Sequence, residues 1–309
     1  MRIFKGIEEF EAFENPVVSI GTFDGVHLGH RTILDRLNSE AKRLSGESLL
    51  ITFWPHPRMV LQPDYKDLRL LNTMEEKVEL LEKAGLQNLL IVPFTKDFSR
   101  TTSHEFIRNI LVDRVKMKKI IIGYDHHFGR NREGSFEVLQ EFQPIFGFEL
   151  EEITAQQIDE INVSSTKIRH ALFDGALDKT KEFLGYNYFV NGTVVKGHSL
   201  GKTLGFPTAN VKVNYPFKLI PKDGVYAVRF CVRNTKYNGM LNIGNRPTFD
   251  GKEQSIEVHL FDFDGNIYAE DVRVEFVERI RDEQRFDGKE ALIAQLKADE
   301  LRARTILND

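Results

Sequence analysis

The stretch V-V-S-I-G-T-F-D-G-V-H-L-G-H, residues 17–30, decides the fold of the first part of the chain. The apolar residues Val17 to Ile20 predict a buried strand, because turn-forming glycines follow them at once. Gly21 to Gly25 predict the turn, and the chain from His27 onward predicts a helix. A strand, a glycine-rich turn and a helix N-terminus in this order form an arrangement whose backbone N–H groups can receive a phosphate.

Two histidines distinguish this segment, here named the H-x-G-H motif (Gly21 to His30). His27 and His30 lie three residues apart and therefore share one face of the predicted helix, near its positive end. Imidazoles there can donate hydrogen bonds to a polyphosphate, and Gly29 between them allows a phosphate to approach the backbone. A metal site is the competing interpretation, but it lacks a third ligand nearby. A helix that merely begins with histidines is the other, and the strand, spacing and glycines disfavour it.

Strand-like and helical patterns alternate through the rest of this first part. Thr73 and Glu76 predict a capping box with Gly85 as the stop of that helix, and Ser103 predicts the cap of the next. Such alternation predicts a Rossmann-like α/β domain, a parallel sheet with helices on both faces. The strand-like runs after the first are residues 49–53, 89–92 and 120–122, and the helical patterns are residues 31–44, 73–84 and 103–115.

Ligands of such sheets bind at the carboxyl ends of the strands. The motifs that begin at Gly21, Pro55 and Gly123 each follow a predicted strand at that end. We therefore expect them to meet at one edge of the sheet.

The second part of the chain is dominated by strand-like runs. Dipeptides typical of turns lie among them, at residues 191–192, 223–224, 250–251 and 264–265. This pattern predicts a small antiparallel β-barrel, followed by a helix from Gly288 to about Arg304. A helix pair at 166–173 and 177–183 is expected to close the first domain, so that the domains are 1–185 and 186–309. The runs are residues 188–195, 224–232, 237–243, 255–261 and 272–278.

Composition limits the classes of function. A chain of 309 residues can hold two cores, and its net charge of -4 offers no basic field for nucleic acid. The single cysteine, Cys231, cannot form an internal disulfide, and its strand-like surroundings predict a buried thiol. The N-terminus is acidic where a signal peptide is apolar, and no apolar run approaches the ~20 residues that span a membrane. We expect a cytoplasmic protein without membrane or nucleic-acid partners.

A second motif, G-K-T-L-G-F-P-T-A-N at residues 201–210, lies in the predicted barrel. Thr208 and Asn210 point the same way in an extended chain, and their oxygens suit Mg²⁺, although a polar loop edge is the alternative. In E-V-H-L-F-D-F the strand period places Glu257, His259 and Phe261 on one face. Glu257 is either an outward-facing strand residue or a general base.

A third segment, S-S-T-K-I-R at residues 164–169, places hydroxyls at a helix start and a cation one turn later. Such hydroxyls either cap the helix or bind phosphate, and the pattern alone favours capping. Arg169 is either a phosphate ligand or a solvated surface charge.

Taken together, the motifs of the first part resemble the adenylyltransferase domain of the bacterial bifunctional riboflavin kinase/FAD synthetases, a family of H-x-G-H nucleotidyltransferases. The chain has the H-x-G-H motif, P-H-P at 55–57, G-Y-D-H-H-F-G at 123–129 and S-S-T-K-I-R, in the family's order. The resemblance implies transfer of AMP from ATP to FMN, giving FAD and pyrophosphate. His126 departs from it, since the family usually has phenylalanine there. The implied catalytic residues are His27, His30 and Arg169, and the implied ATP- and phosphate-binding residues are Gly21, Phe23, Gly29, His56, Asp125, Ser164, Ser165 and Thr166.

The second part resembles the riboflavin kinase domain of the same family. It carries residues 201–210, G-V-Y at 224–226, N-I-G-N-R-P-T-F at 242–249 and R-D-E-Q-R-F at 281–286. By resemblance, Thr208 and Asn210 hold Mg²⁺ with ATP, and Glu257 accepts the proton of the riboflavin 5′-hydroxyl. Gly201 and Lys202 would bind ATP, with Lys202 standing where arginine is common. The implied flavin-binding residues are Arg281, Glu283 and Phe286.

Three functions are compatible with these motifs. The first is a bifunctional enzyme with substrates riboflavin, FMN and ATP, with FMN as intermediate and FAD as product, and it is compatible with a homo-oligomer. The second is an adenylyltransferase whose barrel only binds flavin; the presence of Glu257, Thr208 and Asn210 disfavours it. The third is a flavin carrier or a nucleic-acid-binding module, and the net charge of -4 counts against nucleic acid.

Overall fold

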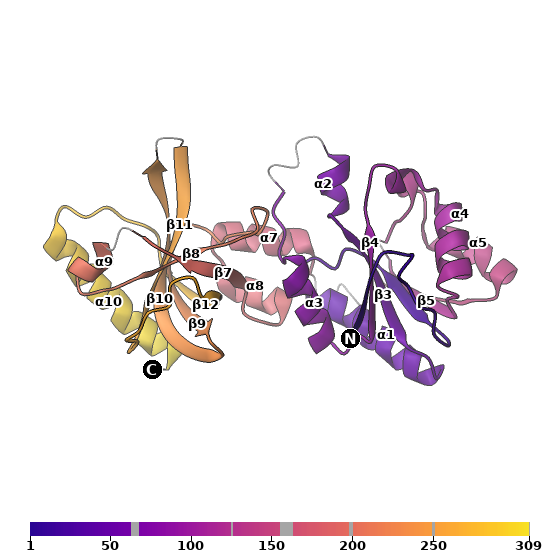
Figure 1. Ribbon diagram of the computed structural model, residues 1–309, viewed down its shortest axis with the longest axis horizontal. Coiled ribbons are helices and arrows are strands. Elements are labelled where there is room, and N and C mark those ends of the chain that lie inside the picture. Colours follow the sequence, from indigo (N-terminus) through magenta and orange to yellow (C-terminus); the bar gives the residue numbers. More distant parts are fainter. Residues whose placement is uncertain (63–67, 125, 155–162, 198–199, 249–250, 309) are drawn as a thin grey trace. The chain divides into compact units, whose positions relative to one another are not determined.

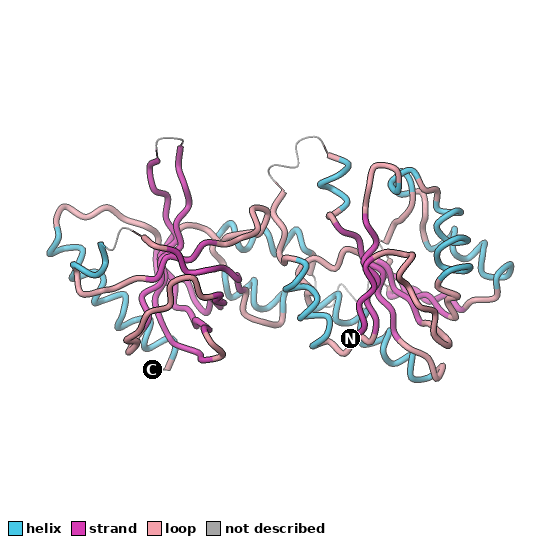
Figure 2. Tube along the Cα trace, in the orientation of Figure 1, coloured by secondary structure: helices cyan, strands magenta, loops and turns pink. Residues whose placement is uncertain are grey.

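The computed structural model describes residues 1–62, 68–124, 126–154, 163–197, 200–248 and 251–308, without the side chains of 200, 202, 245–248 and 251–253 (Figure 1). Contacts divide the chain into two compact units, Met1–Ser165 and Thr166–Asp309. Figure 2 shows that strands and helices alternate in the first unit, whereas strands make up much of the second.

The first unit is built on a six-stranded sheet in the order β1-β4-β3-β2-β5-β6, with all neighbouring pairs parallel. The predicted parallel sheet with helices is therefore confirmed. The strands are β1 Arg2–Lys5, β2 Val17–Ile20, β3 Ser48–Trp54, β4 Asn88–Pro93, β5 Lys119–Gly123 and β6 Glu149–Ile153. The helical segments are α1 Leu28–Arg43, α2 Pro57–Leu61, α3 Met74–Lys83, η2 Phe98–Arg100, α4 Ser103–Glu105, η3 Phe106–Arg114, η4 Arg130–Arg132 and α5 Phe136–Phe146.

Burial explains which strands the sequence predicted. All four residues of β2 are buried, as are the first five of β3, so these central strands form continuous apolar runs. The two edge strands were not predicted. In β1 and β6 most residues are exposed or half-buried, and their sequences R-I-F-K and E-L-E-E-I lack such a run.

Helix boundaries follow the capping residues. The capping box of Thr73 and Glu76 is confirmed at the start of α3. The predicted cap Ser103 is wrong by one residue, because Thr102 caps α4 and forms a capping box with Glu105. The segment after α4 is a π-helix over nine residues, η3, where an ordinary α-helix was expected.

The second unit is a closed antiparallel barrel with strand order β10-β11-β8-β7-β12-β9, as expected. The helix α10 packs on it through Ala303 and Leu307, which share a core cluster with Val225 and Met240. The strands are β7 Phe189–Val195, β8 Ala209–Lys212, β9 Gly224–Val232, β10 Thr235–Thr248, β11 Gly251–Leu260 and β12 Asp271–Arg281, and the helices are α7 Ser165–Asp174, α8 Leu177–Leu184, α9 Leu200–Thr203 and α10 Lys289–Leu307.

Three sequence expectations for this unit need correction. Asn191-Gly192 is not a turn but lies inside β7, where a Cβ on Gly192 would stand 2.5 Å from the Lys212 carbonyl oxygen. Ala209–Lys212 is a strand that was not predicted. Cys231 is half-buried rather than buried, and desolvation raises the pKa of its thiol.

The helix pair α7 and α8 was expected to close the first domain. Its contacts group it with the barrel instead: the Lys222 N–H donates to the Leu172 carbonyl at 3.0 Å, and α8 packs against β12. The sequence predicts a boundary at residue 185, whereas the contact-based division falls between Ser165 and Thr166, at the start of the helix pair.

No helix in the described ranges is both long and apolar enough to cross a membrane.

Candidate active sites

The carboxyl edge of the sheet carries the first group of predicted residues. β2 lies between β3 and β5, and all three run parallel, so the segments after them end at one edge. The Gly21 N–H donates to the Ile51 carbonyl at 3.0 Å, which fixes the start of the H-x-G-H motif beside β3. The prediction that the motifs after these three strands meet is consistent with this order.

The two imidazoles of the motif lie together. His27 is the N-cap of α1, and its Nδ1 accepts a hydrogen bond from the His30 N–H at 3.3 Å. The His27 and His30 rings stack with their centroids 3.6 Å apart. The Phe23 ring also stacks on His30, with the centroids 4.5 Å apart. Desolvation, with His27 and Lys77 nearby, lowers the pKa of His30 well below its ordinary value. His30 is therefore a neutral hydrogen-bonding group at pH 7.

The backbone of the motif is strained. Phe23 and Val26 have φ of +46° and +37°, a region that side-chain-bearing residues and above all β-branched ones avoid. Strain of this kind costs on the order of 1–3 kcal/mol per residue and gathers at functional sites. Gly29 packs between its neighbours, since an added Cβ would lie 3.3 Å from the His27 ring and from Val163.

The acidic residue of the motif has a structural role. The buried Asp24 carboxylate accepts hydrogen bonds from the backbone N–H groups of Leu71 and Asn72, at 3.0 and 3.2 Å. From α3, the buried Lys77 ammonium donates to the Thr22 carbonyl at 2.6 Å. Sequence reasoning missed Asp24 and Lys77. For Lys77, the sequence did offer a signal, because a lysine on the apolar face of a predicted helix indicates a buried charge.

Other predicted residues of this site have varied surroundings. The Ser165 hydroxyl, which belongs to the first unit, donates to the Asp24 carbonyl at 2.8 Å. His56 caps α2, where its Nδ1 accepts from the Arg58 N–H at 3.2 Å. Ser164 is half-buried in the first unit, whereas the exposed Thr166 and the half-buried Arg169 belong to the second. Asp125 lies outside the described residues.

His126, the departure from the family pattern, has a buried Nε2 without a hydrogen-bond partner among the described residues. Desolvation, with His127 and Arg132 nearby, lowers its pKa to about 4. Its ring stacks on Phe128 with centroids 5.9 Å apart, so it packs as an aromatic residue.

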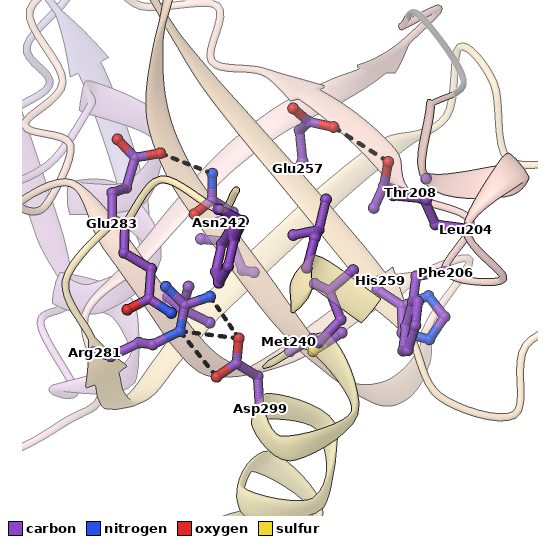
Figure 3. Close-up of a pocket in the computed structure, with 17 residues that line it drawn as sticks. Leu204, Phe206, Thr208, Met240, Asn242, Glu257, His259, Arg281, Glu283 and Asp299 are labelled. Atoms are coloured by element: carbon purple, nitrogen blue, oxygen red, sulfur yellow. Dashed lines mark hydrogen bonds and ion pairs between the residues drawn. The ribbon is translucent and has the colours of Figure 1, made fainter. Parts of the chain in front are cut away.

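The barrel contains the second site, a cavity of about 330 Å³ between the strands and α10 (Figure 3). Thr208 and Glu257 line it, and the Thr208 hydroxyl donates to the Glu257 carboxylate at 3.3 Å. Asn210 of β8 stands directly opposite Glu257 of β11 in the antiparallel ladder, so the two side chains leave the sheet on the same face. The structure thus gathers all three residues that the sequence singled out for the kinase chemistry.

Close packing shapes the loop before Thr208. A Cβ on Gly201, a cavity residue, would lie 2.2 Å from the Phe206 carbonyl oxygen and 3.3 Å from the Thr208 hydroxyl. His259 also lines the cavity and holds the same loop, since its Nδ1 lies 2.8 Å from the Pro207 carbonyl oxygen. The side chain of Lys202 lies outside the described residues.

The predicted flavin residues line the same cavity. Arg281 donates to both carboxylate oxygens of the buried Asp299 on α10, at 2.7 to 3.0 Å, and Phe286 lies against the Arg281 guanidinium at 5.8 Å. The Asn242 amide donates to the Glu283 carboxylate at 3.2 Å (Figure 3). Asn242 and Asp299 were not predicted, because their roles depend on contacts between distant segments.

The neighbouring side chains of Thr208, Asn210 and Glu257 can do two kinds of chemistry. The hydroxyl, amide and carboxylate of Thr208, Asn210 and Glu257 are hard oxygen ligands. A carboxylate within a cavity can also accept a proton from a bound hydroxyl. In the sheet unit, the stacked imidazoles and the buried ammonium suit anions. Within the described ranges, no three His, Cys, Asp or Glu side chains are placed to hold a metal ion by themselves.

Comparison with known proteins identifies both units. A family model described as FAD synthetase matches residues 9–167, and one described as riboflavin kinase matches residues 184–307. The bifunctional riboflavin kinase/FMN adenylyltransferase of Listeria monocytogenes is 38% identical over 287 residues, covering 93% of this chain and 90% of the relative. The enzyme of that name from Escherichia coli K12 is 36% identical over 307 residues, covering 98% of this chain and 97% of the relative.

A solved structure shares the fold over nearly the full length. It is the crystal structure of a Streptococcus pneumoniae protein named as a macrolide-efflux protein, with a TM-score of 0.90 and 32% identity, covering 98% of this chain and 99% of that one. The two family models and the full-length relatives agree on the activities. The chain therefore belongs to the bifunctional riboflavin kinase/FMN adenylyltransferases, and it is an enzyme that phosphorylates riboflavin to FMN and adenylylates FMN to FAD.

Proposed function

We propose that the barrel cavity is the riboflavin kinase site and that Glu257 is its general base. The observation that carries this proposal is the Glu257 carboxylate in the cavity wall, hydrogen-bonded to Thr208 at 3.3 Å and opposite Asn210. Glu257 takes the proton of the riboflavin 5′-hydroxyl while that oxygen attacks the γ-phosphorus of ATP. The bond between that phosphorus and the β–γ bridging oxygen breaks, and ADP leaves with the electron pair.

Magnesium with ATP is part of the proposal. Thr208 and Asn210 are the residues that would hold Mg²⁺, and the gathered hydroxyl, amide and carboxylate oxygens fit a hard cation. When bound, the ion neutralises phosphate charge and orients the transferred group. Gly201 and Lys202 are proposed to bind the ATP phosphates beside it.

The flavin is proposed to occupy the part of the cavity near α10. Arg281, Glu283 and Phe286 line the cavity, and Arg281 is held by Asp299 of α10 in a bidentate ion pair. A guanidinium that is fixed in this way offers its remaining surface for stacking or hydrogen bonding to a planar ring.

The sheet edge is proposed to be the adenylyltransferase site. An oxygen of the FMN phosphate attacks the α-phosphorus of ATP, and pyrophosphate leaves with the electrons of the broken bond. Because that phosphate is already ionised, the step needs charge stabilisation and alignment rather than a base. His27, His30 and Arg169 supply the stabilisation. The proposed ATP- and phosphate-binding residues are Gly21, Phe23, Gly29, His56, Asp125, Ser164, Ser165 and Thr166.

A chromatographic time course with riboflavin, ATP and Mg²⁺ tests the two-step scheme. FMN is expected first and FAD afterwards, and removal of Mg²⁺ with EDTA is expected to stop both steps. In a His30→Ala variant, FMN is expected to accumulate while FAD formation stops. An unchanged FAD yield from that variant would remove the imidazoles from the adenylyl-transfer site.

The remaining parts of the proposal concern organisation. We place the functional division at residues 1–185 and 186–309, supported by family models that end at 167 and begin at 184. A cytoplasmic location is supported by the single free cysteine, Cys231. The proposed reactions are compatible with a monomer and with a homo-oligomer. Sedimentation velocity distinguishes these two states.

A further inference from the structure

Lys77 of α3 occupies a position where a lysine is costly. It lies on the face of α3 that also carries Leu80 and Leu81, and it is 3% exposed. A buried ammonium loses hydration, which must be replaced by charges and hydrogen-bond acceptors. Desolvation lowers its pKa to about 8, and the nearby Asp24 carboxylate opposes that effect.

The protein supplies few charges and hydrogen-bond acceptors to replace the lost hydration of the Lys77 ammonium. Among the described residues, the Thr22 carbonyl at 2.6 Å is the hydrogen-bond acceptor of the Lys77 ammonium, which has three N–H donors. The Asp24 carboxylate is engaged by the N–H groups of Leu71 and Asn72. Lys77 is also close enough to His30 for its charge to lower the pKa of that imidazole. The ammonium therefore lies beside the H-x-G-H motif with hydrogen-bonding capacity to spare.

Other buried polar atoms around the motif lack partners within the described part of the chain. They are Nδ1 of His30, Oγ1 of Thr52 and both polar atoms of the Asn72 side chain. Thr52 follows Ile51, whose carbonyl binds Gly21, and the Asn72 N–H binds Asp24. Unsatisfied buried polar atoms cost roughly 1–3 kcal/mol each, so a group of them around one turn indicates a polar ligand.

We propose that Lys77 is a phosphate-binding cation of the adenylyl-transfer site, with one N–H holding the motif through Thr22 and the others directed to oxygens of the ATP polyphosphate. It stabilises negative charge on the polyphosphate as pyrophosphate leaves, and it exchanges no proton. This inference rests on the proposed placement of adenylyl transfer at the sheet edge. It adds α3 to the site, an element from which the sequence motifs take no residue.

Lys77→Met tests the proposal, with Lys83→Met as the matched control. Lys83 lies on the same helix, is exposed and pairs with Glu79. Methionine keeps much of the buried stem and removes the charge. With FMN, ATP and Mg²⁺, Lys77→Met is expected to lower kcat/KM of FAD formation roughly 10²-fold, as for loss of one donor to developing charge. Riboflavin phosphorylation by the same molecule is expected to stay at the rate of the unmodified chain.

Binding measurements separate phosphate binding from a structural role. Calorimetry with pyrophosphate is expected to give at least tenfold weaker binding for Lys77→Met, with FMN affinity unchanged. Lys77→Gln, which keeps a donor for Thr22 without the charge, is expected to show the same loss. Unchanged pyrophosphate affinity in both variants would overturn the proposal, as would a loss confined to FMN. If His30→Ala abolishes FAD formation and Lys77→Met leaves it unchanged, the role of Lys77 is refuted while the sheet edge remains the adenylyl-transfer site. If neither variant affects FAD formation, the placement of adenylyl transfer at the sheet edge is itself refuted.

Discussion

The two proposed ATP sites of this enzyme differ in the carboxylates that they offer. At the sheet edge, the stacked His27 and His30 and the buried Lys77 are neutral or cationic, and the Asp24 carboxylate is occupied by backbone N–H groups. In the barrel cavity, Glu257 and other carboxylates form part of the wall. This difference matches the two nucleophiles. The FMN phosphate is already ionised and needs no base, whereas the riboflavin hydroxyl must lose a proton to a base.

Replacing the proposed base gives the largest expected effect. Glu257→Gln keeps the shape and the hydrogen bond with Thr208 but accepts no proton. Riboflavin phosphorylation is expected to fall by ~10²–10⁴, the usual contribution of a positioned base, and FMN adenylylation is expected to persist. Separate assays of the two half-reactions measure this.

Glu278→Gln is the matched control for that experiment, since Glu278 lies on the barrel strand β12 and pairs with Arg302 at 3.6 Å. It is expected to leave both reactions unchanged. If Glu257→Gln phosphorylated riboflavin at the wild-type rate, the general base would be another residue. The proposed difference between the two sites would then no longer hold.

The ion pair behind the flavin residues gives the next largest effect. Asp299→Asn removes the charge partner of Arg281, and breaking a buried pair costs about 3 kcal/mol. The barrel is expected to lose stability by that amount, and the riboflavin KM is expected to rise as Arg281 loses its fixed orientation. Hydrogen exchange of barrel amides measures the stability.

Trp54, the single tryptophan of the chain, supplies the control for Asp299→Asn. It ends β3 in the sheet unit, so its fluorescence reports unfolding of that unit. An equal loss of stability in the Trp54 signal would mean that the two units do not respond independently.

The sequence predicted those features that depend on local pattern. Apolar runs predicted the central strands, the Thr73–Glu76 spacing predicted the capping box, and the strand period placed Glu257 and His259 on one face. Edge strands β1 and β6 were missed because half-exposed strands lack an apolar run.

The features that escaped prediction depend on tertiary contacts. Nothing near Lys77 in the sequence reveals that its ammonium meets Thr22, and nothing near Asp299 reveals Arg281. The helix pair α7 and α8 was expected in the first domain but is grouped by its contacts with the barrel, because a helical pattern does not specify the surface against which the helix packs.

A smaller effect is expected from crowding the H-x-G-H motif. A Cβ on Gly21 would lie 2.8 Å from the Phe23 ring, which stacks on His30. Overpacking of this kind costs about 1–3 kcal/mol, so Gly21→Ala is expected to lower FAD formation from FMN about tenfold. Riboflavin phosphorylation by the same variant is the internal control, and an equal decline there would point to general misfolding.

The smallest effect is a pH dependence of stability that belongs to the sheet unit. The pKa of His126 is lowered to about 4 in the folded chain and returns to its ordinary value of 6.5 on unfolding. Between those values the unfolded state binds more protons, so stability is complete above 6.5 and is lost as pH falls toward 4. From pH 7 to 5.5, His126 is expected to remove about 1 kcal/mol of stability. Guanidinium unfolding followed by Trp54 fluorescence measures the loss. His126→Phe should reduce this dependence by that amount because phenylalanine does not titrate, while His30, whose pKa is also lowered, keeps its own share. An unaltered pH slope in that variant would show that His126 does not contribute.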